Sequence, residues 1–209
     1  MAVKEQQKVL NMKSLRIILW CAVAIMAGLS GYLWLSQKQP LQVANQSAVK
    51  IGSPFNLVSH TGAPITEAAL QGRRHAMFFG FTHCPDICPT TLLQTAGWMK
   101  KLGTDSEKID FYFFTVDPER DTPEIMSDYV NAFDPRITGV TGSSEEITKM
   151  LKGYKVYAKR VDLEDDDYTM DHSAFVMLFR SDGSFQGTIS FDENEEAALA
   201  KLQRLIKSG

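Results

Sequence analysis

The sequence predicts an α/β domain that follows an N-terminal transmembrane helix. Three observations predict this fold class: a long uncharged segment near the start, apolar segments that alternate with helix signals, and a terminal hairpin followed by a last helix. Such alternation is typical of a sheet covered by helices. The 209 residues are 44% hydrophobic and 22% charged, with a formal net charge of -3. This balance suits one globular domain and does not favour a nucleic-acid partner.

The uncharged segment covers residues 17–35 (IILWCAVAIMAGLSGYLWL). As a helix, at about 1.5 Å per residue, it would span roughly 28 Å, close to the ~30 Å hydrocarbon core of a bilayer. Basic residues exceed acidic ones in the preceding tail, so the tail should stay cytoplasmic and the rest should cross the membrane. A cleaved signal peptide is the alternative, but its apolar region normally has about 7–15 residues. Cys21 lies inside the segment and should contact lipid or pack.

We therefore expect a cytoplasmic tail over 1–16, a transmembrane anchor over 17–35, a linker over 36–50 and a globular domain over 51–209. The linker is polar, has no periodicity and contains proline, as flexible connections do. The tail is too short and too poor in arginine for a mitochondrial transit peptide. A bacterial inner membrane with a periplasmic domain is therefore favoured, and the mitochondrial inner membrane facing the intermembrane space is the alternative.

The first half of the domain alternates strands and helices. Residues 77–82 (MFFGFT) form an apolar segment that predicts a buried strand, and a helix is expected over 89–102. The aromatic and β-branched segment 109–117 predicts a second strand. Thr122, followed by a proline, is a typical N-cap and predicts a helix over 123–133.

The alternation continues with a short strand over 137–140. Ser143 and Glu146 have the spacing of a capping box, which predicts a helix that ends near residue 154. A further strand is expected over 156–162, where apolar and polar residues mix.

The end of the chain predicts a hairpin and a helix. Strands over 173–179 and 184–190 are joined by an SDG turn. Asp192, with an acid three positions later, is expected to cap a helix over 197–206. Residues 55–72 would add a hairpin before the first core strand. This order is compatible with a thioredoxin-like fold, a central mixed sheet flanked by helices on both faces.

Two of the three cysteines lie in the segment HCPDICP (83–89), and each precedes a proline. A residue before proline is disfavoured in the α region, whereas proline fits the first helical position. We therefore expect Cys88 at or near the N-cap of helix 89–102, with Cys84 in the preceding loop. Both sulfurs would lie beside a helix N-terminus, whose partial positive charge favours thiolate over thiol.

Three kinds of chemistry remain open for this pair. A structural disulfide or two inert thiols would be the simplest, but cores seldom place prolines after both cysteines. Redox pairs usually have two intervening residues, whereas Cys84 and Cys88 have three. The wider spacing can close a disulfide and can also direct both sulfurs at one ion, for which soft thiolates favour Cu(I) or Zn. A third ligand would favour the metal site.

The histidines supply one candidate for that ligand. His60 and His75 lie in polar segments and are expected at the surface. His83 comes at the end of a strand, where adjacent side chains point in opposite directions. Its ring should therefore point away from Cys84, and it is a supporting candidate only. His172 precedes an apolar strand that, in a thioredoxin-like arrangement, faces the cysteine loop. Two thiolates and one imidazole form a trigonal set suited to Cu(I). Asp171 is expected to orient this loop, since a ligand histidine usually needs an acceptor for its other ring nitrogen.

The segments FTHCPDICPTT, VDPERDTPE (116–124) and DHSAFVMLF together resemble the SCO/SenC family. The resemblance implies a membrane-anchored, thioredoxin-like protein that serves cytochrome c oxidase assembly. It also implies a copper ion, Cu(I) or Cu(II), held by Cys84, Cys88 and His172. Asp86 matches the acid inside the cysteine motif, and Asp117 matches a structural turn near the site.

Two functions follow from the resemblance. The first is a copper metallochaperone that delivers copper to the cytochrome c oxidase subunit bearing the CuA site, with other periplasmic copper chaperones as further partners. The second is a thiol–disulfide oxidoreductase in which Cys84 and Cys88 are a redox-active pair that keeps the cysteines of copper-site proteins reduced. Whether the protein is an enzyme therefore stays open. A peroxidase would need one solitary activated cysteine, which the pair fits poorly.

Overall fold

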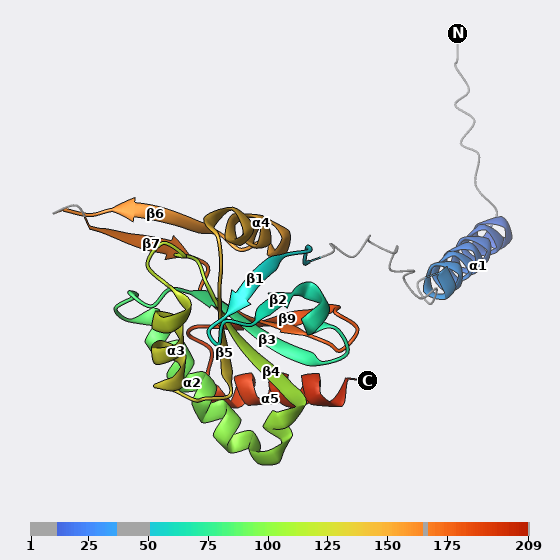
Figure 1. Ribbon diagram of the computed structural model, residues 1–209. Helices are drawn as coiled ribbons and strands as arrows, with labels where there is room; N and C mark the ends of the chain where they lie inside the picture. Colours follow the sequence, from blue (N-terminus) through green and yellow to red (C-terminus); the bar gives the residue numbers. More distant parts are fainter. Residues whose placement is uncertain (1–11, 37–50, 165–166, 209) are drawn as a thin grey trace, which may run out of the picture. The chain divides into compact units, whose positions relative to one another are not determined.

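The computed structural model describes residues 12–36, 51–164 and 167–208, which form an N-terminal helix and a separate domain (Figure 1). Helix α1 (Met12–Ser36) extends beyond both ends of the predicted anchor. Its segment Leu15–Tyr32 is long and apolar enough to cross a membrane, and Cys21 is exposed on it. Residues 1–11 of the predicted tail and 37–50 of the predicted linker lie outside the described residues.

The described strands of the domain form a seven-stranded mixed sheet in the order β2-β1-β5-β4-β3-β8-β9. The strands are β1 (Asn56–Ser59), β2 (Pro64–Thr66), β3 (Arg74–Gly80), β4 (Ile109–Thr115), β5 (Ile137–Thr141), β8 (Phe175–Phe179) and β9 (Phe185–Ser190). β3, β4 and β5 are parallel, whereas β8 runs antiparallel to β3. The predicted hairpin over 55–72 is β1–β2, followed by the 3-10 helix η1 (Glu67–Leu70). The mixed sheet expected from the sequence is confirmed.

The helices of the domain are α2 (Ile87–Leu102), α3 (Pro123–Asn131), α4 (Ser144–Tyr154) and α5 (Glu195–Lys207), with the 3-10 helix η2 (Gly103–Lys108) after α2. As predicted, the Thr122 side chain accepts a hydrogen bond from the first turn of α3. Ser143 caps α4, but Glu146 accepts from the backbone N–H of Asn56, so the capping box is only half formed. The predicted Asp192 cap is wrong. Asn194 caps α5. Its side-chain oxygen accepts a hydrogen bond from the N–H of Ala197, three positions later, which is the spacing of an N-cap.

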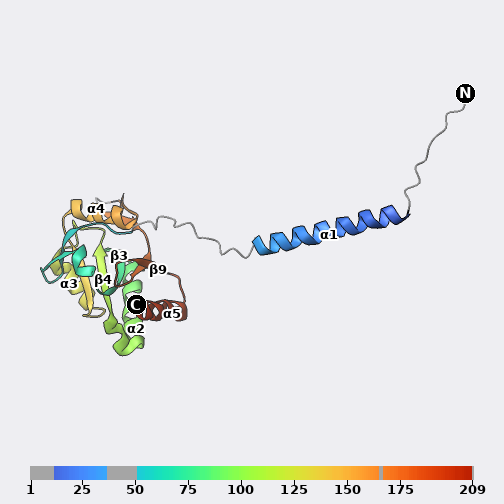
Figure 2. The ribbon, with the colours of Figure 1, turned by 90° about the vertical axis from the view of Figure 1, so that its right-hand side faces the viewer.

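Helices cover both faces of the sheet, as the thioredoxin-like prediction requires. On one face, Phe113 of β4 packs against Phe78 of β3 and Tyr129 of α3, and α5 packs against α2. On the other face, Phe79 packs against Tyr154 at the end of α4. Both views place α4 on the opposite side from α2 and α5 (Figures 1 and 2). Successive strand residues point to opposite faces, so neighbours 78 and 79 fill different layers of the core.

A second sheet projects from the body of the domain (Figure 1). It consists of β6 (Ala158–Asp162) and β7 (Tyr168–His172), which pair antiparallel with each other. β7 was not predicted from the sequence, because its residues YTMDH have no apolar alternation. We call this pair the β6–β7 hairpin. His172 is therefore the last residue of a strand, and β8 begins only at Phe175.

One of the two surface predictions for histidines is wrong. His75 is not at the surface: it is the second residue of β3, is 2% exposed, and stacks on Phe179. Strand β3 starts three residues earlier than expected because Arg74 already pairs in register with Ile109 of β4. His60 is half-buried, and its Nδ1 accepts a hydrogen bond from the Gly139 N–H.

Candidate metal centre

The two cysteines lie where β3 ends and α2 begins. Cys84 is half-buried in the loop, and Cys88 is fully buried in the first turn of the helix. Cys88 lies near the N-cap, as predicted, although the helix starts at Ile87, two residues earlier than expected, and Asp86 is the N-cap. The shift is tolerated because backbone N–H groups in a first helical turn have no partner within the helix, so Pro89 removes no hydrogen bond there.

The Cys88 sulfur lies directly against the last residue of β3. A Cβ atom at Gly80 would lie 2.6 Å from Cys88 Sγ and 2.8 Å from the Phe113 ring. Both distances are shorter than van der Waals contact, so a residue with a side chain does not fit. Gly80 thus allows the helix to place a thiol against the sheet.

The imidazole of His172 meets these sulfurs from the end of β7. Its Nε2 lies 3.4 Å from Cys88 Sγ, and its Nδ1 lies 3.0 Å from the Ser173 carbonyl oxygen. A carbonyl only accepts, so Nδ1 carries the proton and the Nε2 lone pair points toward the sulfurs. Asp171 was expected to orient this loop, but the acceptor for the ring is the Ser173 carbonyl. The edge of the Phe81 ring also packs against the imidazole, with centroids 5.7 Å apart.

One ligand atom from each of Cys84, Cys88 and His172 lies within 4.8 Å of the other two. Atoms at such separations can bind one ion with little rearrangement. Two sulfurs and one imidazole nitrogen are the donors that Cu(I) and Zn prefer, so this site fits a soft metal. His83 stands apart from this group: its ring is half exposed and contacts the Thr82 hydroxyl.

The two thiols share one proton in the metal-free chain. The neighbouring Cys88 side chain is the main cause that lowers the pKa of Cys84 to about 3, and the His172 ring and the backbone N–H groups of Asp86 and Cys88 lower it further. The same contact and burial raise the pKa of Cys88. These opposite shifts favour a thiolate on Cys84 and a thiol on Cys88. The thiolate is the form that binds metals and attacks disulfides.

Alkylation should reveal this asymmetry. Between pH 5 and pH 8 the rate at which iodoacetamide modifies Cys84 should stay nearly constant, because Cys84 is already a thiolate throughout that range. An ordinary cysteine, with a pKa of about 8.5, reacts about tenfold faster for each pH unit in the same interval. Mass spectrometry of the peptides after timed quenching measures both cysteines. The chain unfolded in urea is the control, and a tenfold rise per pH unit for Cys84 in the folded chain would contradict the shared proton.

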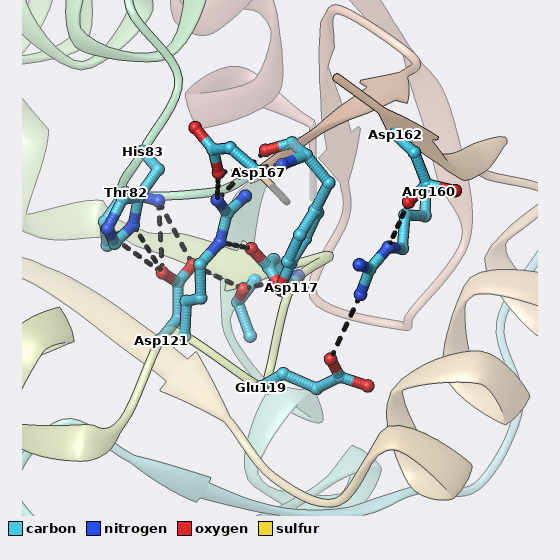
Figure 3. A network of polar contacts seen from close by, with 11 residues as sticks. Thr82, His83, Asp117, Glu119, Asp121, Arg160, Asp162 and Asp167 are labelled. Carbon is cyan, nitrogen blue, oxygen red and sulfur yellow. Dashed lines mark hydrogen bonds and ion pairs between the residues drawn. The ribbon is translucent and has the colours of Figure 1, made fainter. Parts of the chain in front are cut away.

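Asp121 holds the cysteine loop to the sheet (Figure 3). Its buried carboxylate accepts hydrogen bonds from the N–H and hydroxyl of Thr82 and from the hydroxyl of Thr115. Thr115 ends β4, and Thr82 lies two residues before Cys84. Asp121 lies within the segment VDPERDTPE, but no signal in the sequence marks it as a support of the site.

Asp117 also lies near the site, as the resemblance implied. It is buried, and it accepts hydrogen bonds from the Tyr168 hydroxyl at 2.8 Å and from Arg120 Nε at 2.5 Å. Tyr168 is the first residue of β7. The turn that follows β4 is therefore tied to the strand that carries His172.

Comparison with known proteins agrees with this geometry. A model of the SCO1/SenC family matches residues 43–207, which is most of the chain. The chain belongs to the SCO1/SenC family. The mitochondrial protein SCO2 of Saccharomyces cerevisiae is 36% identical over 202 residues, which cover 90% of this chain and 67% of the yeast protein.

Two solved SCO structures share the fold. The structure of Bradyrhizobium japonicum ScoI with copper bound is 42% identical, with a TM-score of 0.70, and the match covers 74% of this chain and 99% of that chain. The crystal structure of yeast Sco1 with copper bound is 32% identical, with a TM-score of 0.70, over 77% of this chain and 90% of that one. SCO relatives of this chain thus come from both bacteria and mitochondria.

Proposed function

We propose that this SCO protein is a membrane-anchored copper metallochaperone that delivers copper to the CuA-bearing subunit of cytochrome c oxidase during assembly. The observation that carries the proposal is the convergence of Cys84, Cys88 and His172, whose donor atoms lie within 4.8 Å of one another. The copper bound in the bacterial and yeast relatives supports copper over zinc as the cargo.

The exposure of the three donors suits transfer by ligand exchange. Cys84 and His172 are half-buried, whereas Cys88 is fully buried. A thiolate or imidazole of the acceptor can therefore replace the outer two ligands first, while Cys88 still holds the ion. A three-coordinate ion leaves room for an incoming ligand before another leaves.

The proposal includes the placement of the chain. Residues 1–16 would be cytoplasmic, 17–35 would anchor the protein in lipid, and 36–50 would link the anchor to a periplasmic domain over 51–209. The apolar segment of α1 supports a single membrane span. The excess of basic residues before the span favours a cytoplasmic tail, and a bacterial relative supports a bacterial inner membrane. A mitochondrial inner membrane with the domain in the intermembrane space is the alternative, since mitochondrial relatives exist.

A second candidate function is thiol–disulfide exchange, favoured by the low pKa of Cys84 beside a protonated Cys88. The Cys84 thiolate would attack a disulfide sulfur of a copper-site protein and release one thiolate. Cys88, after losing its proton, would attack the mixed disulfide and release the second thiolate. The partner gains two electrons, and the Cys84–Cys88 pair becomes a disulfide that an external dithiol must reduce. This reaction does not require His172.

Replacing His172 by alanine separates the two functions. The full chain in detergent should bind one Cu(I) per chain, and His172→Ala should lower the affinity by more than about 100-fold, since residues that merely support a ligand already account for 10–100-fold. Competition with a chromogenic Cu(I) chelator measures both. His83→Ala is the matched control, because its ring is half exposed and lies outside the donor group.

The same variant tests the alternative. Reduction of a disulfide-bonded CuA-site peptide by His172→Ala should continue at a rate close to that of the parent chain, because both cysteines remain. Unchanged copper affinity in His172→Ala would refute the three-ligand site and leave dithiol exchange as the function that the cysteines support.

A further inference from the structure

We propose that Arg120 is the positioning residue that holds His172 in place to receive copper, an inference that rests on the proposed function. His172 belongs to the β6–β7 hairpin, which pairs with itself and not with the seven-stranded sheet, in the part of the chain that the structure describes. The ladder of the large sheet therefore ends short of the imidazole, and side-chain contacts with the body of the domain add to what holds it relative to the two cysteines.

Arg120 makes that contact from the turn after β4. Its guanidinium lies 3.7 Å from the centroid of the Tyr168 ring and donates to the Tyr168 carbonyl oxygen at 3.0 Å. It also forms an ion pair with Asp117, whose other carboxylate oxygen accepts from the Tyr168 hydroxyl. Arg120 thus contacts the ring and the backbone of Tyr168, and Asp117 contacts its hydroxyl. We call these three residues the Tyr168 clamp.

The clamp is largely removed from water. The side chain of Arg120 is 19% exposed and that of Asp117 is 3% exposed. Ion pairs at such sites are screened less than surface pairs and keep a more defined geometry. A planar guanidinium can stack on a ring and donate in its own plane at once, which a lysine cannot do.

The Tyr168 clamp is connected to the His172 imidazole in two ways. Tyr168 and His172 lie four residues apart on β7, so they share one face of the strand, and fixing one end of this short strand fixes the other. In addition, Arg120 lies 5.9 Å from the centroid of the Phe81 ring, and Phe81 packs edge-on against His172. Arg120 therefore lies against two residues that help to place the imidazole, Tyr168 on the same strand and Phe81 against the ring.

Arg160 offers a matched control on the same ring. Its guanidinium also lies 3.7 Å from the Tyr168 centroid, so it must occupy the face opposite Arg120. Its side chain is half exposed, and its ion pairs are with Glu119 and Asp162 (Figure 3). Arg160 thus carries the same charge and stacking but has no ion pair with Asp117.

Arg120→Gln should lower Cu(I) affinity about 10–100-fold, the range for residues that orient a metal ligand. Arg160→Gln should lower it less than threefold. The decisive measurement is a double-mutant cycle in the full chain in detergent: in the His172→Ala background, Arg120→Gln should cause no further loss. The Cu(II) form of Arg120→Gln should also lose the nitrogen hyperfine splitting in its electron paramagnetic resonance spectrum while keeping thiolate-to-copper absorption.

Hydrogen exchange of the metal-free chain provides a readout that does not depend on copper. In Arg120→Gln, amides of β6 and β7 should exchange at least tenfold faster than in the parent, whereas amides of β3 should not change. An equal loss of copper affinity with and without His172, or unchanged hairpin exchange, would overturn the positioning role. Failure of the proposed function would appear differently: the parent chain itself would show no dependence of copper affinity on His172.

Discussion

Replacing Asp121 by alanine should lower the free energy of unfolding by about 3 kcal/mol. The carboxylate is buried and accepts three hydrogen bonds, from the N–H and hydroxyl of Thr82 and from the hydroxyl of Thr115. Leaving a buried donor without a partner costs about 1–3 kcal/mol, and the two hydroxyls can rotate to recover part of that loss. The effect is expected to be large because this one carboxylate joins Thr115, at the end of β4, to Thr82, before the cysteine loop.

Urea unfolding of the full chain in detergent, followed by near-ultraviolet circular dichroism, measures this change. Asp128→Ala is the control, since Asp128 lies exposed on α3 and should shift stability by less than about 0.5 kcal/mol. Copper affinity should also fall in Asp121→Ala, because Thr82 anchors the loop of Cys84. A loss of stability below about 1 kcal/mol would show that the loop does not depend on this carboxylate.

Gly80→Ala should disturb the site by crowding. The added Cβ would lie 2.6 Å from Cys88 Sγ and 2.8 Å from Phe113, so the first turn of α2 must move away from the sheet. Overpacking a well-packed core costs about 1–3 kcal/mol. Because the sulfur that moves is a donor atom, the affinity for Cu(I) should fall at least tenfold.

Gly97→Ala is the matched substitution with the opposite expectation. Gly97 lies on α2, and an added Cβ would meet no atom within 4 Å. Alanine is favoured over glycine in a helix by about 1 kcal/mol, so this variant should be more stable than the parent and bind copper unchanged. Chelator competition and urea unfolding of the two variants side by side make the comparison. Equal copper affinity in both variants would mean that Cys88 does not need its position against β3.

Local signals in the sequence were sufficient for much of the fold. Thr122 and Ser143 cap the helices that they were expected to cap, because an N-cap depends on neighbours three residues away. The buried strands β3 and β4 were recognised from their apolar residues. Where two cap candidates compete, as Asp192 and Asn194 do, the choice depends on where the preceding turn ends, which local composition does not determine.

The donors of the site were predictable, but their supports were not. The prolines after Cys84 and Cys88 and the position of His172 before a strand pointed to the cluster that the structure shows. Arg120 and Asp121 could not be recognised as supports from the sequence. The contacts that tie them to the site, Asp121 with Thr82 and Arg120 with Tyr168, join residues 39 and 48 positions apart. His75 was misassigned for a similar reason, since pairing between distant strands buries a residue that follows two arginines.

The hairpin that carries the imidazole has a further consequence. Because β6 and β7 share no backbone ladder with the large sheet, they can open locally at a free energy well below that of global unfolding. The rate of copper release then depends on local opening of the β6–β7 hairpin. The thermal stability of the domain depends instead on the aromatic core of the seven-stranded sheet. Substitutions that stabilise only the seven-stranded sheet should therefore leave the rate of metal exchange unchanged.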